Sequence, residues 1–189
     1  MNNPPWVAPI IITNSDGAAL TNTVTATSIL PSQALGALPR NYLAIGTRLK
    51  IEAFGRISTL VTAPGTLTFS LRNAAGVIFA TSDALALNIV AKTNVAWGLE
   101  WWLTCRAIGG TTTANFMHNG WWESEAVIGS PLLSAGGVGF LPLQASAPVV
   151  GAGFNSSTTE LSIDLFATWS VASASNSILC HQFNAVAAG

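Results

Sequence analysis

The sequence predicts an all-β protein: a single antiparallel β-sandwich of eight to ten strands, with an extended N-terminal arm and a jelly roll as the favoured topology. Three observations support this class. Apolar residues alternate with Thr, Ser, Asn and charged residues over many short stretches, as in strands with one buried face. Gly, Pro and Asn separate these stretches, and no segment shows a convincing 3.6-residue helical period. The length of 189 residues fits one sandwich domain.

The first half of the chain contains the clearest alternation. Residues 47–53 place Leu49, Ile51 and Ala53 on one face and charged side chains on the other, which predicts a half-buried strand. Residues 65–73 repeat the pattern, and the sequence Asn-Ala-Ala-Gly at 73–76 predicts a turn into a short partner strand at 77–80. Proline and glycine limit residues 33–44 to a brief helical turn.

Further strands are expected at 83–91 and 95–108. The second range puts Trp97, Trp101 and Cys105 on one face and Glu100 and Trp102 on the other, which is typical of a central strand. Residues 160–170 alternate again, and 178–186 form a last strand. Because only a short turn segment separates these two ranges, we expect them to form a hairpin.

Two segments do not fit a self-contained sandwich and predict the domain organisation. Residues 1–22 are expected to be an extended arm, and 23–189 the sandwich domain. The arm carries an apolar run, residues 6–13, that is expected to bind a surface. The uncharged stretch 126–159 is long for a connection, so it is expected to be a functional loop that hides one or two strands near 138–143. The apolar residues predicted to form an assembly interface are Trp6, Val7, Ile10, Ile11, Ile12, Leu132, Leu133, Phe140 and Leu141.

The composition narrows the function classes. Lys and Arg number 7 and Asp and Glu 8, so charged residues make up 8% of the chain, against roughly 25% in ordinary domains. A net charge of −1 without basic runs argues against a nucleic-acid partner, and the prolines and glycines of the uncharged stretch argue against a membrane span. Cys105 and Cys180 are expected to be buried thiols. The start of the chain lacks a secretion signal, which indicates synthesis in a cytoplasm.

Chemical motifs are scarce, so neither catalytic residues nor a cofactor or metal site is predicted. His118 and His181 are far apart and suit a core or a surface position better than metal binding. One constellation is open to two interpretations: Trp121, Trp122, Glu123 and Glu125. These side chains either form an ordinary strand edge, with one indole packed inward, or a face on which indoles stack against sugar rings.

Two parts of the chain resemble structural proteins of tailed bacteriophages. One part is Gly46-Thr-Arg-Leu-Lys-Ile-Glu-Ala-Phe-Gly-Arg-Ile-Ser58, followed by Gly65-Thr-Leu-Thr-Phe-Ser-Leu-Arg72 and a Trp-rich strand that starts Val95-Ala-Trp-Gly-Leu-Glu-Trp. The other is Leu161-Ser-Ile-Asp-Leu-Phe-Ala-Thr-Trp169 with the residues up to Phe183. The resemblance covers about 60% of the chain in packing patterns and carries no functional residues over. It implies a virion-associated β-sandwich, namely a capsid decoration or cement protein forming trimers on the shell.

Two functions follow as hypotheses. The first is a non-enzymatic structural protein on the exterior of a capsid, which binds and stabilises the major capsid protein as a homotrimer. Interface centres are depleted in charge, so the low charge and the apolar arm fit this role. The alternative is a receptor- or carbohydrate-binding module of a tail tip or baseplate that uses Trp121 and its neighbours.

Overall fold

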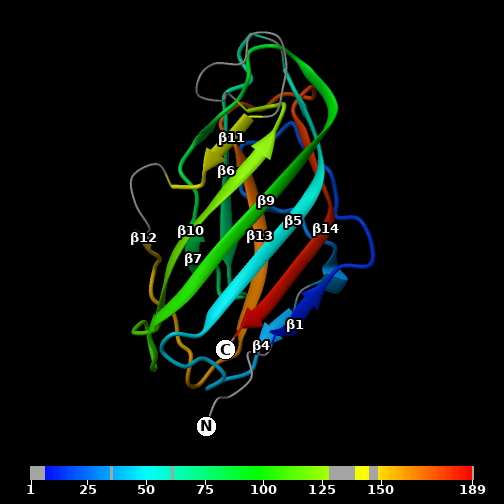
Figure 1. The fold of residues 1–189 in the computed structure, drawn as a ribbon. Coiled ribbons are helices and arrows are strands. Elements are labelled where there is room, and N and C mark those ends of the chain that lie inside the picture. Colours follow the sequence, from blue (N-terminus) through cyan, green and yellow to red (C-terminus); the bar gives the residue numbers. More distant parts are fainter. Residues whose placement is uncertain (1–6, 35, 61, 128–138, 145–148, 189) are drawn as a thin grey trace.

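Two antiparallel sheets stack face to face in the computed structural model, which describes residues 7–34, 36–60, 62–127, 139–144 and 149–188 (Figure 1). The large sheet has the strand order β1-β14-β5-β9-β10-β11, with β2 also paired to β14 and β12 to β10. The small sheet has the order β3-β13-β6-β7, with β4 paired to β13 and β8 to β6. The predicted all-β sandwich is confirmed.

The described residues hold more strands than expected, because several consist of only two residues. The large sheet comprises β1 (Val7–Ile12), β2 (Leu20–Thr21), β5 (Arg48–Thr59), β9 (Lys92–Ala107), β10 (Asn115–Ser124), β11 (Gly139–Pro142), β12 (Val149–Val150) and β14 (Ser177–Ala188). The small sheet comprises β3 (Thr27–Ser28), β4 (Gly36–Leu38), β6 (Thr66–Arg72), β7 (Ile78–Thr81), β8 (Leu85–Ala86) and β13 (Leu161–Trp169). A single 3-10 turn, Ser32–Ala34, is the only helical element among the described residues.

Strand alternation decides which side chains enter the core between the sheets. In β9, Trp97, Leu99, Trp101, Leu103 and Cys105 are all buried, while the residues between them face outward. From the small sheet, Phe69 packs edge-on against Trp122 with ring centroids 5.5 Å apart. The contact joins β6 to β10 across the sandwich, so aromatic side chains from both sheets fill the interior.

Most strand predictions are confirmed, and two are wrong. The expected hairpin of 160–170 with 178–186 does not form, because β13 lies in the small sheet and β14 in the large one. The chain crosses between the layers there, and each strand pairs with a partner distant in sequence: β13 with β6, and β14 with β5. The strand expected at 83–91 is reduced to Leu85–Ala86, with Leu87 in an isolated bridge to Val127.

From Val7 onward, the segment predicted to be an N-terminal arm adds a strand to the chain's own sheet. β1 runs antiparallel to β14, and Thr13 continues the pairing by a backbone hydrogen bond to the Phe183 carbonyl. Ile11 is buried in the core, so this residue of the predicted assembly interface instead anchors the segment to the domain. Its neighbour Ile12 points the other way and is 68% exposed.

Candidate functional site

The outer face of the large sheet gathers the exposed aromatic and charged side chains that sequence alternation leaves outside the core. Strand register aligns them in two rows across β14, β5, β9, β10 and β11. One row contains Asn184, Glu52, Glu100, Trp121 and Pro142, and the next contains Gln182, Phe54, Gly98, Glu123 and Phe140. Neighbouring strands lie about 4.8 Å apart, so cross-strand neighbours in each row are close enough for direct contact.

An ion cluster occupies the first row and the strand positions next to it. The Lys50 ammonium lies 2.8 Å from Glu52 Oε1 and 2.9 Å from Glu100 Oε2. The Trp102 indole N–H donates to Glu100 Oε1 at 2.7 Å. The guanidinium of Arg48 lies over the Trp102 ring, 4.7 Å from its centre. One ammonium therefore serves two carboxylates.

The contacts within the cluster shift the pKa values of Lys50 and Glu100. Hydrogen bonds to Glu52 and Glu100 raise the pKa of Lys50 above its ordinary value. Burial acts to raise the pKa of Glu100, but the hydrogen bonds from Lys50 and Trp102 outweigh it and hold that pKa below its ordinary value. Lys50 and Glu100 accordingly remain charged around neutral pH.

Three large aromatic side chains stand exposed beside this cluster. Phe54 is 44%, Trp121 37% and Phe140 56% exposed. Trp121 and Phe140 contact one another, with ring centroids 5.8 Å apart and a tilt of 34° between the planes. Exposed aromatic residues gathered on one face are characteristic of binding surfaces, whereas apolar residues scattered singly are not.

Phe54 stands between three shallow hollows of this face. A hollow of about 330 Å³ lies toward β14 and β1, where Ile12 and Gln182 line it. A second, of about 270 Å³, lies along β9 and β10 next to Glu125. A third, of about 150 Å³, is lined by Glu52, Phe54, Gly98, Glu100, Trp121 and Glu123. We name this third one the acidic hollow.

Gly98 forms the floor beneath Phe54. A Cβ atom at this position would lie 3.1 Å from Glu123 Oε1 and 3.3 Å from the Phe54 ring. Those distances are tighter than ordinary carbon contacts, so the absent side chain lets the Phe54 ring and the Glu123 carboxylate approach the sheet. The glycine thereby helps to define the acidic hollow.

The predicted sugar-binding constellation is only partly brought together on this face. Trp122 is fully buried, because it is offset by one residue from Trp121 along β10 and so points into the core. Its inclusion in a glycan face is wrong. Trp121 and Glu123 do share the outer face, and both line the acidic hollow.

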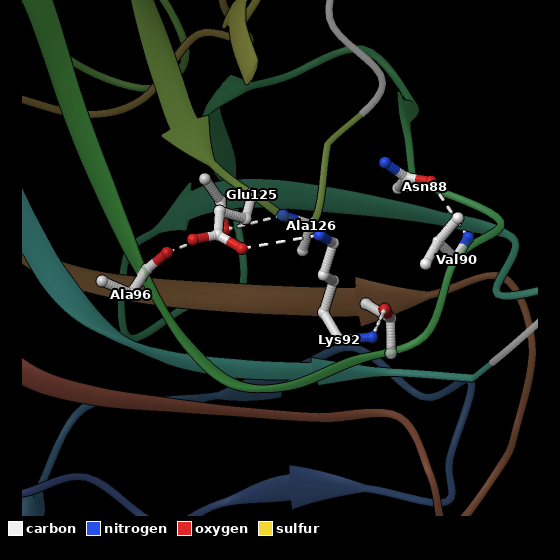
Figure 2. Close-up of polar contacts among 8 residues, drawn as sticks. Asn88, Val90, Lys92, Ala96, Glu125 and Ala126 are labelled. Carbon is white, nitrogen blue, oxygen red and sulfur yellow. Dashed lines mark hydrogen bonds and ion pairs between the residues drawn. The ribbon is translucent and has the colours of Figure 1, made fainter. Parts of the chain in front are cut away.

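Glu125 lies just beyond β10 at a corner held by several polar contacts (Figure 2). Its carboxylate is 3.5 Å from Lys92 Nζ at the start of β9. In the same corner, Ser124 Oγ donates to the Ala96 carbonyl at 2.8 Å and accepts from the Ala126 N–H at 3.1 Å. Glu125 thus already has a cationic partner, which sets it apart from Glu123.

The residues predicted to form an assembly interface are likewise divided between the surface and the core. Phe140 and Ile12 are exposed, Ile10 and Leu141 pack partly against the core, and Ile11 is buried. Val7 lies in β1 with no described side chain. Trp6, Leu132 and Leu133 fall outside the described residues.

Sequence reasoning missed Phe54, Gly98, Glu52 and Glu100 as parts of the site. The expected strand 47–53 stops one residue before Phe54, whereas β5 continues to Thr59. The signal was available: Ile57 continues the inward alternation of Ile51 and Ala53, which leaves Phe54 outside with Lys50 and Glu52. The pairing of β5 with β9 could not be read from the sequence, because periodicity does not identify partners.

Other chemically capable side chains lie away from this face. His118 is buried 3.3 Å from the Trp101 indole nitrogen, and His181 is paired with Asp16 at 2.8 Å on the surface. Cys105 and Cys180 are buried free thiols, as expected, and burial raises the pKa of Cys180 to about 12. Among the described residues, no three His, Cys, Asp or Glu side chains cluster closely enough to hold a metal ion. No helix in the described ranges has the length and hydrophobicity to cross a bilayer.

No protein-family model matches the sequence, and no curated protein is significantly similar to it.

Proposed function

We propose that the protein is a non-enzymatic structural subunit whose large-sheet outer face binds another protein, and that the assembly is a bacteriophage virion. In this proposal the protein is a homotrimeric decoration protein that binds and stabilises the major capsid protein on the exterior of the shell. The virion setting rests on the sequence resemblance described above. The role as a subunit rests on the geometry of the outer face.

The exposure of Phe54, Trp121 and Phe140 on one face is the observation that carries the proposal. Each of these rings buries roughly 150–250 Å² when covered, which at about 25 cal/mol per Å² is a substantial driving force for association. In the nearby ion cluster, Lys50 is already paired with Glu52 and Glu100. A partner therefore meets aromatic surface next to a cluster in which two carboxylates share one ammonium.

The strand order offers a second, weaker line of support. The order β1-β14-β5-β9 over β3-β13-β6-β7 corresponds to the two four-stranded sheets of a jelly roll, with β10 and β11 extending the large one. We infer this topology from the order alone. Jelly rolls occur in viral capsid proteins and also in lectins, so the topology is compatible with the proposal without selecting it.

Attachment to capsid shells tests the proposal. The variant Phe140→Ser should no longer co-sediment with shells of the major capsid protein, because it removes an exposed ring from the interface without opening the core. Val24→Ser is the matched control, since Val24 is also exposed but lies between β2 and β3. Circular dichroism should be unchanged in both variants. Unimpaired sedimentation of Phe140→Ser with shells would contradict the proposal.

The oligomeric state is a separate part of the proposal and has its own measurement. Sedimentation velocity of the wild-type chain should give a trimer at concentrations where a lone sandwich would be a monomer. A monomer at every concentration would overturn the homotrimer.

Carbohydrate binding is the second candidate, favoured by the contact of Trp121 with Phe140 at an exposed sheet edge. Two of its predicted residues are not available for a sugar: Trp122 is buried in the core, and Glu125 pairs with Lys92. A glycan array with wild type and Trp121→Ala tests it. Binding that Trp121→Ala abolishes would support this candidate, and an array without signal would remove it.

A further inference from the structure

The acidic hollow combines three carboxylates with two aromatic side chains. Glu52, Glu100 and Glu123 approach it from β5, β9 and β10, and Phe54 and Trp121 supply its aromatic lining. Its volume of about 150 Å³ suits one large side chain rather than a peptide segment. No Lys, Arg or His is among the residues that line it in the described part of the chain.

The charges around the hollow do not balance. In the part of the chain that the structure describes, Lys50 is the only cation in contact with Glu52 and Glu100, and it is shared between them. Glu123 makes no ion pair or side-chain hydrogen bond with any described residue, in contrast to Glu125, which pairs with Lys92. Three carboxylates therefore face one ammonium, and the hollow lacks positive charge.

We propose that the acidic hollow binds the guanidinium group of an arginine side chain that projects from the partner protein. The inference rests on the proposed function, because it names the chemistry of the partner at the same outer face. Arginine fits both halves of the lining. Its planar guanidinium donates hydrogen bonds to carboxylates in a fork geometry and stacks on aromatic rings, while a lysine ammonium is a compact, strongly hydrated point charge.

Other occupants fit less well. An apolar side chain would remove water from Glu123 and leave that charge unpaired, which is costly. A sugar could hydrogen-bond to the carboxylates and stack on Trp121, but it would leave the charge imbalance in place. Charge complementarity with the partner therefore favours a cation, and the aromatic lining favours arginine among the cations.

The experiment uses a small probe in place of the unidentified partner. Nα-acetyl-arginine N-methylamide is titrated into the full-length protein, and the indole N–H signals are followed by NMR, with Trp121 assigned through Trp121→Phe. The citrulline analogue, which keeps the shape but lacks the charge, serves as the ligand control. We expect the arginine probe to move the Trp121 signal in a saturable way, and citrulline to bind at least about tenfold more weakly, as for loss of a charged hydrogen bond.

Two variants locate the effect. Glu123→Gln should weaken binding of the arginine probe by about tenfold or more, because it removes the unpaired carboxylate from an exposed position. Glu160→Gln changes the net charge equally at another exposed site and should leave the affinity unchanged. Raising the salt concentration should weaken wild-type binding more than that of Glu123→Gln.

The outcomes separate this inference from the proposed function. Equal binding of arginine and citrulline probes, or no effect of Glu123→Gln, overturns the arginine site even when Phe140→Ser abolishes shell attachment. Saturable binding of a neutral oligosaccharide in place of arginine overturns it too, and favours the carbohydrate candidate. A third outcome is that probe binding depends on Glu123 but the Phe140→Ser variant still attaches to shells. This result would support the arginine site and contradict the proposed role of the outer face.

Discussion

Lowering the pH from 7 to 5 should destabilise the protein through His118. This side chain is 1% exposed in the core between β10 and the small sheet, and the Trp101 indole N–H donates to its Nδ1 at 3.3 Å. Burial lowers the pKa of His118 to about 4, with the Gln144 side chain acting in the opposite direction. The ordinary pKa of about 6.5 holds in the unfolded chain.

The size of the effect follows from these two pKa values. Between pH 6.5 and 4 the unfolded chain binds the proton more readily than the folded one, so the free energy of unfolding falls as the pH decreases. The loss amounts to about 2 kcal/mol at pH 5 and approaches about 3.4 kcal/mol below pH 4. Above about pH 7.5 this contribution is fully present and no longer changes.

Urea unfolding at pH 7 and pH 5 measures the effect. His118→Gln removes the titrating group. Between pH 7 and pH 5, the free energy of unfolding of this variant should therefore fall by about 2 kcal/mol less than that of wild type. His181→Gln is the control and should behave as wild type, because that imidazole lies at the surface beside Asp16. Equal losses in wild type and His118→Gln would refute the description of His118 as a neutral core residue.

Three further predictions concern the core and its close contacts. Trp101→Phe should lower the free energy of unfolding more than Trp122→Phe, by about 1–2 kcal/mol, because the Trp101 N–H has an acceptor and the Trp122 N–H has none among the described residues; thermal denaturation of both variants tests this. Gly55→Ala should be strongly destabilising by the same assay, since its Cβ would collide with the Leu179 carbonyl, whereas Gly110→Ala meets only ordinary contact. A thiol reagent such as DTNB should label neither cysteine in the native protein and both in urea, and rapid native labelling would contradict their burial.

The fold could be predicted where one face of a strand is buried. In β9 the alternation of Trp97, Leu99 and Trp101 with polar residues identified the strand and its inner face, and the structure confirms both. The hairpin of 160–170 with 178–186 was wrong for a physical reason. Alternation reports which face of a strand is apolar, but not which strand pairs with it, and a short connection can cross between sheets as easily as it can turn within one.

Only part of the candidate site could be predicted from the sequence. Trp121 and Trp122 have the same chemistry, and their one-residue offset along β10 sends one to the surface and the other to the core. Phe140 was named from an uncharged stretch, and its contact with Trp121 depends on the pairing of β10 with β11. The acidic hollow draws its lining from three strands, so no local pattern in the sequence could have revealed it.

Hydroxyl-radical footprinting of Trp121, Phe54 and Phe140 tests most directly whether other subunits cover the outer face. The purified assembly is compared with the isolated chain by mass spectrometry, and Phe166, which borders a hollow beside β13, serves as the internal reference. We expect the three rings to be oxidised several-fold less in the assembly, with Phe166 unchanged. Equal oxidation of the three rings in both samples would contradict the account.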